Sequence, residues 1–492
     1  MSKFKRILSL FLCLIFLFGA MCGCSEKYEE AIVYFELLEK PKTLDPQTAQ
    51  DDSELLIIRN IYEGLMRETD TGEIVEGACE SYVYNNLTYT FTLRDNVSWS
   101  NGDKLTAYDF EYAFRRAVDP KINAPFASRL FAIENAKAIA SGTADVSALG
   151  VRATDEKTLV IKLCQEDNDF LKTLATSVCM PCNEKFFDES IGKYGLDAKC
   201  IISNGSYRLT KWNKEEFGIR IYKNEEYTGD FKAKNAAVFI SCIDNEAQVA
   251  RLGGESDIAF VGGAELDNAK NAGLETTSVQ NVCWVMTISR NFSSEVRRAL
   301  AAGFSTDVYS ESLALGYSAA KSIYPEVLGI KLDGVGITPY NINESKSIMS
   351  AQVAAMEDKK FPPSVLYYYN EDGAKELATS IVGHWQQNLS TFINIKSADN
   401  LEALQNEIHE NELEFALFPI TAKSEFFSEY AKQFTNDVSV VTPDQLQQQL
   451  LSDYTIIPVA YQDTNISYIS TLEGIVVGDD NGYIDFSYII KR

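Results

Sequence analysis

Cysteine and histidine are the residue types in this chain best suited to catalysis or metal binding. Cys179 and Cys182 are separated by two residues, a spacing that suits a redox pair or half of a metal site. The sequence has no second pair with this spacing, so a four-cysteine zinc site is unsupported. We expect free thiols or one local disulfide rather than thiol chemistry. His384 and His409 lie in sequence typical of a helix surface, which leaves little material for a catalytic triad or a zinc site.

Acidic side chains offer a second kind of chemistry. The chain has 70 Asp and Glu residues against 45 Lys and Arg, for a net charge of −25. Paired carboxylates hydrolyse glycosides and peptides, but no catalytic spacing stands out, so we expect no enzyme, no cofactor and no metal. Nucleic-acid binders need clustered positive charge, which excludes a nucleic-acid partner. We interpret the excess of acidic residues as a means of keeping a surface protein soluble; the alternative is that it attracts cationic ligands.

The first 24 residues have the features of an export signal. Basic residues precede an apolar run at 7–20, and Met-Cys-Gly-Cys follows at 21–24. This segment resembles the lipobox of bacterial lipoproteins, which implies that residues 1–23 are a signal peptide and that Cys24 is lipidated. The protein would then be held by its lipid on the extracellular face of the cell membrane. The alternative is an uncleaved anchor helix, but the apolar run is shorter than the roughly 20 residues of a membrane span.

The elements that position these groups follow from apolar patterns. Residues 53–66 place apolar side chains on one face of a helix. Alternation over residues 88–93 predicts a half-buried strand. Thr106 and Asp109 are spaced as a helix cap, for a helix that ends near 119–120. The first 200 residues therefore mix hairpins with helices.

The C-terminal third has a more regular rhythm. Strands are predicted at 365–369, 392–396 and 415–420, with helices at 371–389 and 401–410 between them. Such alternation indicates a parallel sheet covered by helices. A chain of 492 residues accommodates two or three domains. We expect two unlike α/β lobes with a cleft between them.

A series of short segments, in order along nearly the whole chain, resembles one family. These segments are residues 43–46 (TLDP), 59–65 (RNIYEGL), 87–94 (LTYTFTLR), 99–102 (WSNG), 105–110 (LTAYDF), 115–120 (RRAVDP), 204–209 (NGSYRL), 253–259 (GGESDIA) and 483–490 (YIDFSYII). The family is that of the extracytoplasmic solute-binding proteins of oligopeptide and dipeptide ABC importers (OppA/DppA-like, family 5). The resemblance implies an α/β, two-lobed periplasmic-binding-protein fold of the cluster C type, with an extra inserted domain and a ligand cleft between the lobes.

The resemblance also implies a division of the chain into domains. Lobe I is discontinuous and comprises residues 24–80, 205–290 and 470–492. Domain II, residues 81–204, is inserted into it, and residues 291–469 form lobe III.

The function implied by the resemblance is capture of peptides and their delivery to the permease subunits of an ABC importer. The partners are then a peptide ligand, the permease and, through the lipid anchor, a membrane; we expect a monomer, periplasmic if the cell is Gram-negative. One alternative is a receptor for a modified peptide or another small solute. Another is a peptide-sensing lipoprotein without transport.

The resemblance places several residues in the cleft. In the family, the loop before the helix at 59–65 lines the cleft, and the aromatic residue of the segment Ala124-Pro125-Phe126 faces the ligand. Trp284, at the crossing between the lobes, and Tyr461, in a late strand, are two further aromatic candidates. The candidate ligand-binding residues are Gln50, Asp51, Asp52, Phe126, Trp284, Lys423 and Tyr461. The alternative is that the aromatic ones are core residues and the acidic ones face solvent.

Lys423 marks a departure from the family. After the strand at 415–418 the family commonly has an aspartate that takes the amino group of the peptide, whereas Lys423 stands closest to that position here. Two outcomes are open. Asp51 or Asp52 takes over that role, or the ligand is not an ordinary free-amino peptide and Lys423 favours a carboxylate or another anion.

Overall fold

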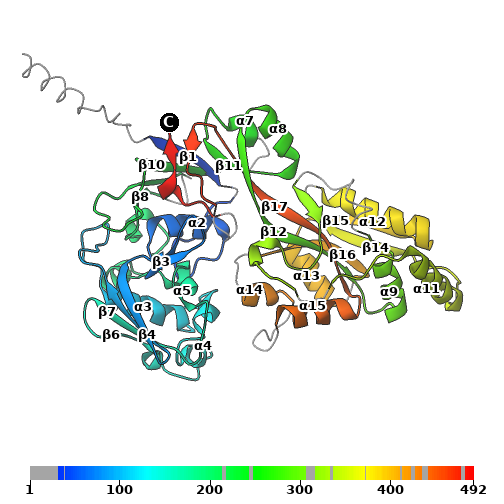
Figure 1. Cartoon of the computed structure of the whole chain (residues 1–492), viewed down its shortest axis with the longest axis horizontal. Coiled ribbons are helices and arrows are strands. Elements are labelled where there is room, and N and C mark those ends of the chain that lie inside the picture. The colour runs from blue at the N-terminus through cyan, green and yellow to red at the C-terminus, as the bar shows by residue number, and fades with distance from the viewer. Residues whose placement is uncertain are drawn as a thin grey trace, which may run out of the picture.

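The protein forms two α/β halves joined by two long strands (Figure 1). The computed structural model describes residues 31–492 except for 38, 213–217, 243–247, 306–315, 333–335, 372, 411–412, 423–426, 435–441 and 478–482. Cys24 and Lys423 lie outside the described residues, as does the predicted signal peptide. Among the described residues, no helix is long and apolar enough to cross a membrane.

The first half is built on one end of the largest sheet. Strand β1 (Ile32–Leu37) pairs in parallel with β10 (Ala237–Cys242) on one side and with β11 (Ile258–Val261) on the other. β9 (Ile219–Lys223) and β8 (Tyr207–Lys211) extend the sheet by antiparallel pairing. Because β1 is a central strand, it is covered on both faces and buries most of its side chains.

Helix α2 (Asp52–Ile61) packs on this half and buries an apolar face that includes Ile57 and Ile61. The helix predicted at 53–66 is thus too long. The backbone N–H of Glu63 donates to the side chain of Asn204, which in turn donates to the carbonyl oxygen of Glu63. This contact with Asn204 gives the backbone N–H and carbonyl of Glu63 hydrogen-bond partners outside a helix. The helix therefore ends at Ile61.

A separate four-stranded antiparallel sheet belongs to the same half (Figure 1). Its order is β4 (Cys79–Asn85), β5 (Thr88–Leu93), β7 (Thr158–Lys162) and β6 (Val151–Ala153). Alternate residues of β5 are buried, which confirms the predicted half-buried strand. Helix α3 (Ala107–Val118) packs on β6 and β7 and begins with the predicted capping box.

The second half confirms the predicted alternation of strands and helices. β14 (Ser364–Tyr369) pairs in parallel with β15 (Ile393–Ala398) and β16 (Phe415–Thr421). Helices α12 (Ala374–Leu389) and α13 (Leu401–His409) connect these strands. Parallel neighbours need such crossover helices, which explains the rhythm of the sequence.

Two long antiparallel strands join the halves. β12 (Glu275–Ile288) pairs with β16 of the second half, and β17 (Ile456–Tyr468) pairs with β11 of the first half and with β12 along most of its length. The register of β12 against β17 shifts between Gln280 and Val282. A single sheet, in the order β15-β14-β16-β12-β17-β11-β1-β10-β9-β8, therefore runs through both halves, with a bulge where it passes between them.

The other elements cover these sheets or form small ribbons. The helices are α4 (Ala136–Ala140), α5 (Phe170–Thr173), α6 (Glu184–Glu189), α7 (Gln248–Arg251), α8 (Leu266–Asn271), α9 (Ser294–Ala302), α11 (Ile342–Ala355), α14 (Phe427–Ala431) and α15 (Pro443–Ser452). The strands are β2 (Met66–Glu68), β3 (Ile74–Glu76), β13 (Tyr317–Ala319), β18 (Leu472–Glu473) and β19 (Ile490–Lys491).

Candidate functional site

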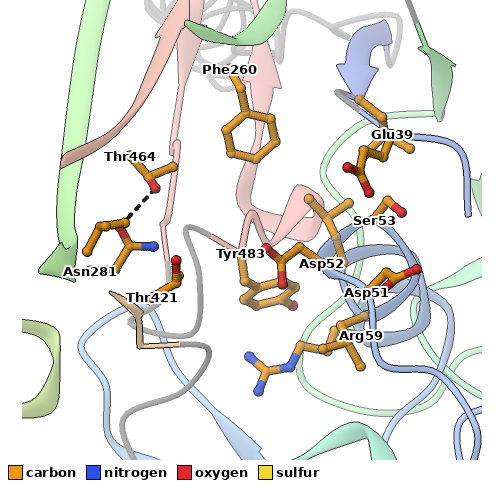
Figure 2. A pocket seen from close by; sticks show the side chains of 14 residues that line it. Glu39, Asp51, Asp52, Ser53, Arg59, Phe260, Asn281, Thr421, Thr464 and Tyr483 are labelled. Atoms are coloured by element: carbon orange, nitrogen blue, oxygen red, sulfur yellow. Dashed lines mark hydrogen bonds between the residues drawn. The ribbon is translucent and has the colours of Figure 1, made fainter. Parts of the chain in front are cut away.

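A cavity of about 400 Å³ lies where the two halves meet. Its volume falls in the range of small-molecule sites, roughly 300–1,000 Å³. Figure 2 shows the side chains that line it. They come from the loop after β1, helix α2, strands β11, β12, β16 and β17, and the segment after β18. The polar and charged ones include Glu39, Asp51, Asp52, Arg59, Asn281, Thr421, Thr464 and Tyr483.

The wall contributed by the first half is charged. The carboxylates of Glu39 and Asp52 point into the cavity in Figure 2, and the guanidinium of Arg59 extends toward its lower end. Asp51 forms an ion pair with Lys42, 2.7 Å from its Nζ. Glu39, Asp51 and Asp52 thus give this wall three carboxylates beside one guanidinium.

A buried carboxylate fixes the shape of this wall. Glu54 is 1% exposed. Its Oε1 accepts from the backbone N–H groups of Lys42 and Thr43, and its Oε2 from those of Gln50 and Asp51. One side chain thus ties the start of α2 to the preceding loop, so the charged residues are positioned before any ligand arrives.

The opposite wall is polar and uncharged. Asn281 and Val282 of β12, Thr464 of β17 and Thr421 of β16 form it. The Thr464 hydroxyl donates to Oδ1 of Asn281 at 2.9 Å. Asn281 lies at the bulge between β12 and β17, which directs its side chain into the space between the halves.

Tyr483 lies at one end of the cavity, with the Cζ of Arg59 4.9 Å from the centre of its ring. Burial and the nearby Asp485 carboxylate raise the pKa of Tyr483 above that of a free phenol, outweighing the opposing effect of Arg67 and Arg59. The phenol therefore stays neutral and presents a hydroxyl and an aromatic edge.

The structure brings two of the predicted binding residues, Asp51 and Asp52, into the cavity lining. Gln50 precedes them but is exposed and does not line the cavity; its backbone N–H binds Glu54. The prediction concerning Lys423 falls outside the described residues.

Trp284 and Tyr461 lie in the interior of the second half and do not line the cavity. Trp284 is fully buried, and its Nε1 donates to Oε1 of Gln462 at 2.6 Å. The Tyr461 hydroxyl accepts from the backbone N–H groups of Lys321 and Ser322. Both aromatic side chains are therefore held by hydrogen bonds within the second half.

Phe126 also lies away from this cavity lining, partly buried beneath Arg129, whose Cζ is 4.4 Å from the ring centre. Two residues further on, Ser128 bonds Lys432, which follows α14 in the second half. Phe126 is thus close to a second place where the halves touch.

Sequence reasoning missed Glu39, Arg59, Asn281, Thr421, Thr464 and Tyr483 as lining residues. Arg59 and Tyr483 stand inside two of the family-like segments, which was a usable signal. Asn281 and Thr464 carried no signal, because their place depends on the pairing of two strands far apart in sequence.

Thiol and metal chemistry have little support in the described residues. Cys179 and Cys182 are free and buried, and burial raises the pKa of both thiols to about 12, which keeps them protonated. His384 lies on α12, partly buried, while the side chain of His409 is outside the described residues. The described residues contain no group of three His, Cys, Asp or Glu residues that could hold a metal ion.

Comparison with known families decides the class of the protein. Residues 73–439 match the family described as "Bacterial extracellular solute-binding proteins, family 5 Middle". The chain belongs to this family. The cavity between the halves is thus the candidate solute site of a family 5 protein.

Individual family 5 proteins are similar over shorter or longer stretches. The oligopeptide-binding protein OppA of Bacillus subtilis (strain 168) is 27% identical over 385 residues, 73% of this chain and 69% of that protein. The periplasmic murein peptide-binding protein MppA of Escherichia coli (strain K12) is 35% identical over 225 residues, 45% of this chain and 41% of that protein.

Solved structures share the family 5 architecture. Listeria monocytogenes OppA bound to peptide aligns with a TM-score of 0.73 at 20% identity, covering 94% of this chain and 99% of that one. The unliganded open form of MppA aligns with a TM-score of 0.70 at 22% identity, covering 94% and 98%. These likenesses confirm the predicted two-lobed α/β fold.

Proposed function

We propose that the protein is a lipid-anchored, extracellular substrate-binding protein that captures peptides and delivers them to the permease of an ABC importer, without catalysis. The observation that carries the proposal is the cavity between the halves, charged on one wall and neutral but polar on the other. Peptides need both kinds of group, because they combine charged ends with backbone donors and acceptors. The names of the similar proteins, which bind oligopeptides and murein peptides, support the same class of ligand.

Capture would proceed by closure of the halves around the ligand. β12 and β17 are the strands that join the halves, and the bulge near Asn281 lies at the cavity. Bending at such a bulge would change the angle between two rigid bodies. In the proposed division, residues 24–80, 205–290 and 470–492 with inserted domain 81–204 move against residues 291–469.

The proposed anchor is the acylated Cys24, exposed after removal of residues 1–23. A tether would hold a monomeric receptor near its permease, at the outer face of a single-membrane cell or in the periplasm of a Gram-negative one. Cys24→Ser should move the protein from the membrane fraction to the soluble fraction of cells, whereas Cys164→Ser should not. Equal membrane recovery of both variants would contradict lipidation at Cys24.

Native mass spectrometry of protein purified without refolding tests peptide capture. We expect bound species whose masses and fragments are those of peptides. Thr421→Trp, which would fill the cavity, should abolish them, while Thr379→Trp on an exposed face of α12 should retain them. A non-peptide solute in the wild type, lost in the cavity variant, would overturn the proposal of peptide capture.

A further inference from the structure

A second cavity, of about 530 Å³, lies at the end of the second half that carries α11, far from the first half in Figure 1. One face of α11, the end of α12 and the residues just before β14 and β15 form it. Among the described residues, none lines both this cavity and the one between the halves. Its volume is also in the range of small-molecule sites, roughly 300–1,000 Å³. It is thus a separate candidate site.

The floor of this second cavity is apolar. Met349, Phe361 and Leu389 form the floor and are buried. Phe392 also lines the cavity but is 56% exposed, so its ring lies at the rim. A hydrocarbon chain in the cavity would cover these side chains, and removal of apolar surface from water is favourable.

The same cavity is lined by three lysines. Lys346 is on α11, and Lys359 and Lys360 lie between α11 and β14. All three are exposed, and none has an ion-pair partner within the part of the chain that the structure describes. In a protein with a net charge of −25, this cavity therefore has a locally cationic rim.

Nearby negative groups do not offset these lysines. Glu357 and Asp358 precede two of them in sequence but do not line the cavity. Glu344 of α11 is paired with Arg298. The C-terminal end of α12 carries the equivalent of about half a negative charge, which is less than the charge of three ammonium groups. The rim therefore favours an anion.

We propose that this second cavity binds an amphipathic anion, whose hydrocarbon chain lies on the apolar floor and whose anionic head binds the ammonium groups of Lys346, Lys359 and Lys360. Each ammonium group supplies three donors, and hydrogen bonds between opposite charges are stronger than neutral ones. A fatty acid in solution and an anionic lipid in a bilayer are two sources of this chemistry. The inference goes beyond peptide capture and does not depend on it.

The experiment is a calorimetric titration of the protein with dodecanoate, kept below the concentration at which it forms micelles. We expect one molecule to bind per protein. Dodecylammonium has the same chain and the opposite charge. It should bind at least about tenfold more weakly, because each exposed charge contact changes affinity by up to about fivefold. Butyrate should bind at least about a hundredfold more weakly than dodecanoate, because each buried methylene strengthens binding by about fourfold.

Replacement of the lysines tests the cationic rim. Lys346→Gln, Lys359→Gln and Lys360→Gln together should weaken dodecanoate binding by about tenfold. The matched control changes the net charge equally by removing three exposed lysines of the first half, which are Lys121→Gln, Lys137→Gln and Lys193→Gln. This control should bind dodecanoate as wild type does.

Filling the cavity tests its location. Ala354 is an exposed lining residue of α11, so Ala354→Trp should abolish dodecanoate binding without disturbing the core. Ala355→Trp changes the next residue of α11, which is exposed and outside the lining, and should retain binding. Thr421→Trp, which fills the cavity between the halves, should retain it as well.

The outcomes do not involve peptides, so they leave the proposed function untouched. Equal binding of dodecanoate and dodecylammonium, or undiminished binding after loss of the three lysines, overturns the assignment of an anion. Binding that Thr421→Trp abolishes and Ala354→Trp retains places the molecule between the halves and overturns this site. Cosedimentation with phosphatidylglycerol vesicles that requires the three lysines supports a bilayer lipid as the source, and titration without cosedimentation supports a free fatty acid.

Discussion

The two halves of the molecule hold their charges differently. The first half has buried ion pairs beside its exposed ones: Arg116 and Asp45 lie 2.7 Å apart with side chains 6% and 7% exposed, and Arg67 and Asp485 are buried likewise. In the second half, the pair of Arg290 and Asp453 has side chains 71% and 34% exposed. A buried charge is costly unless it is paired, whereas an exposed ion pair contributes little to the free energy of unfolding because water solvates both charges.

This difference matches the two walls of the cavity. The charged wall belongs to the half in which Glu54 and Arg116 lock carboxylates and backbone into one arrangement. The wall on the other side belongs to β12, β16 and β17, which pack in the second half on an apolar core that includes the rings of Trp385 and Phe415. In this protein the charged wall of the cavity thus belongs to the half whose buried charges are fixed by several hydrogen bonds.

Breaking the buried pair should have the largest effect. Arg116→Met keeps the volume but leaves the Asp45 carboxylate buried without its cation, so the free energy of unfolding should fall by about 3–5 kcal/mol. Urea denaturation measures it. Adding Asp45→Asn should restore part of the loss; a loss below about 1 kcal/mol for Arg116→Met would show that the first half does not depend on this pair.

Removing the charge of Glu54 should have the second-largest effect on stability. Gln keeps one acceptor and turns an amide toward backbone N–H groups, so Glu54→Gln should cost about 2 kcal/mol of unfolding free energy. It should also weaken peptide binding, because Lys42 and Asp51 lose their common anchor. Calorimetric titration and urea denaturation check both effects, with Glu344→Gln, in a pair of partly exposed side chains, as control. Normal binding by Glu54→Gln would mean that the charged wall needs no such support.

Breaking the exposed pair should have a small effect. Arg290→Ala should lower the free energy of unfolding by no more than about 1 kcal/mol, because water replaces the lost guanidinium as the partner of the exposed Asp453 carboxylate. High salt should reduce even this difference. A loss comparable to that of Arg116→Met would remove the contrast between the halves.

The smallest expected effect is the pH response of His384. Burial, and then the nearby Lys346, lower its pKa in the folded protein. The unfolded chain then binds a proton more readily, so acidification below roughly pH 6.5, the ordinary histidine pKa, favours unfolding. His384→Gln should remove this contribution, so the urea midpoint of the variant, taken relative to that of wild type, should be higher at pH 5.5 than at pH 7.5. An identical difference at both pH values would contradict a lowered pKa.

Local patterns predicted the elements that depend on neighbouring residues. The alternation of β5 and the Thr106–Asp109 cap of α3 required no distant partner. The end of α2 did, since Asn204 binds Glu63 from 141 residues away. Trp284 is another residue whose position could not be predicted from local sequence. Its residue type suits a ligand site or a core, and the pairing of β12 placed it in the core.

The cavity itself was predictable only in part. Asp51 and Asp52 could be found because they adjoin a recognisable segment. Asn281 could not, because its exposure to the cavity comes from a shift in strand register, and register depends on every pair along β12 and β17.

The amino-acid sequence alone determined the α/β class, the family resemblance and the acidity, since these follow from composition and from periods of a few residues. Only the tertiary structure decided which acids line the cavity and which support its wall. That distinction depends on contacts such as Asp51 with Lys42 and Glu54 with four backbone groups. Identical carboxylates take different roles because burial and partners, rather than residue type, set what each one binds.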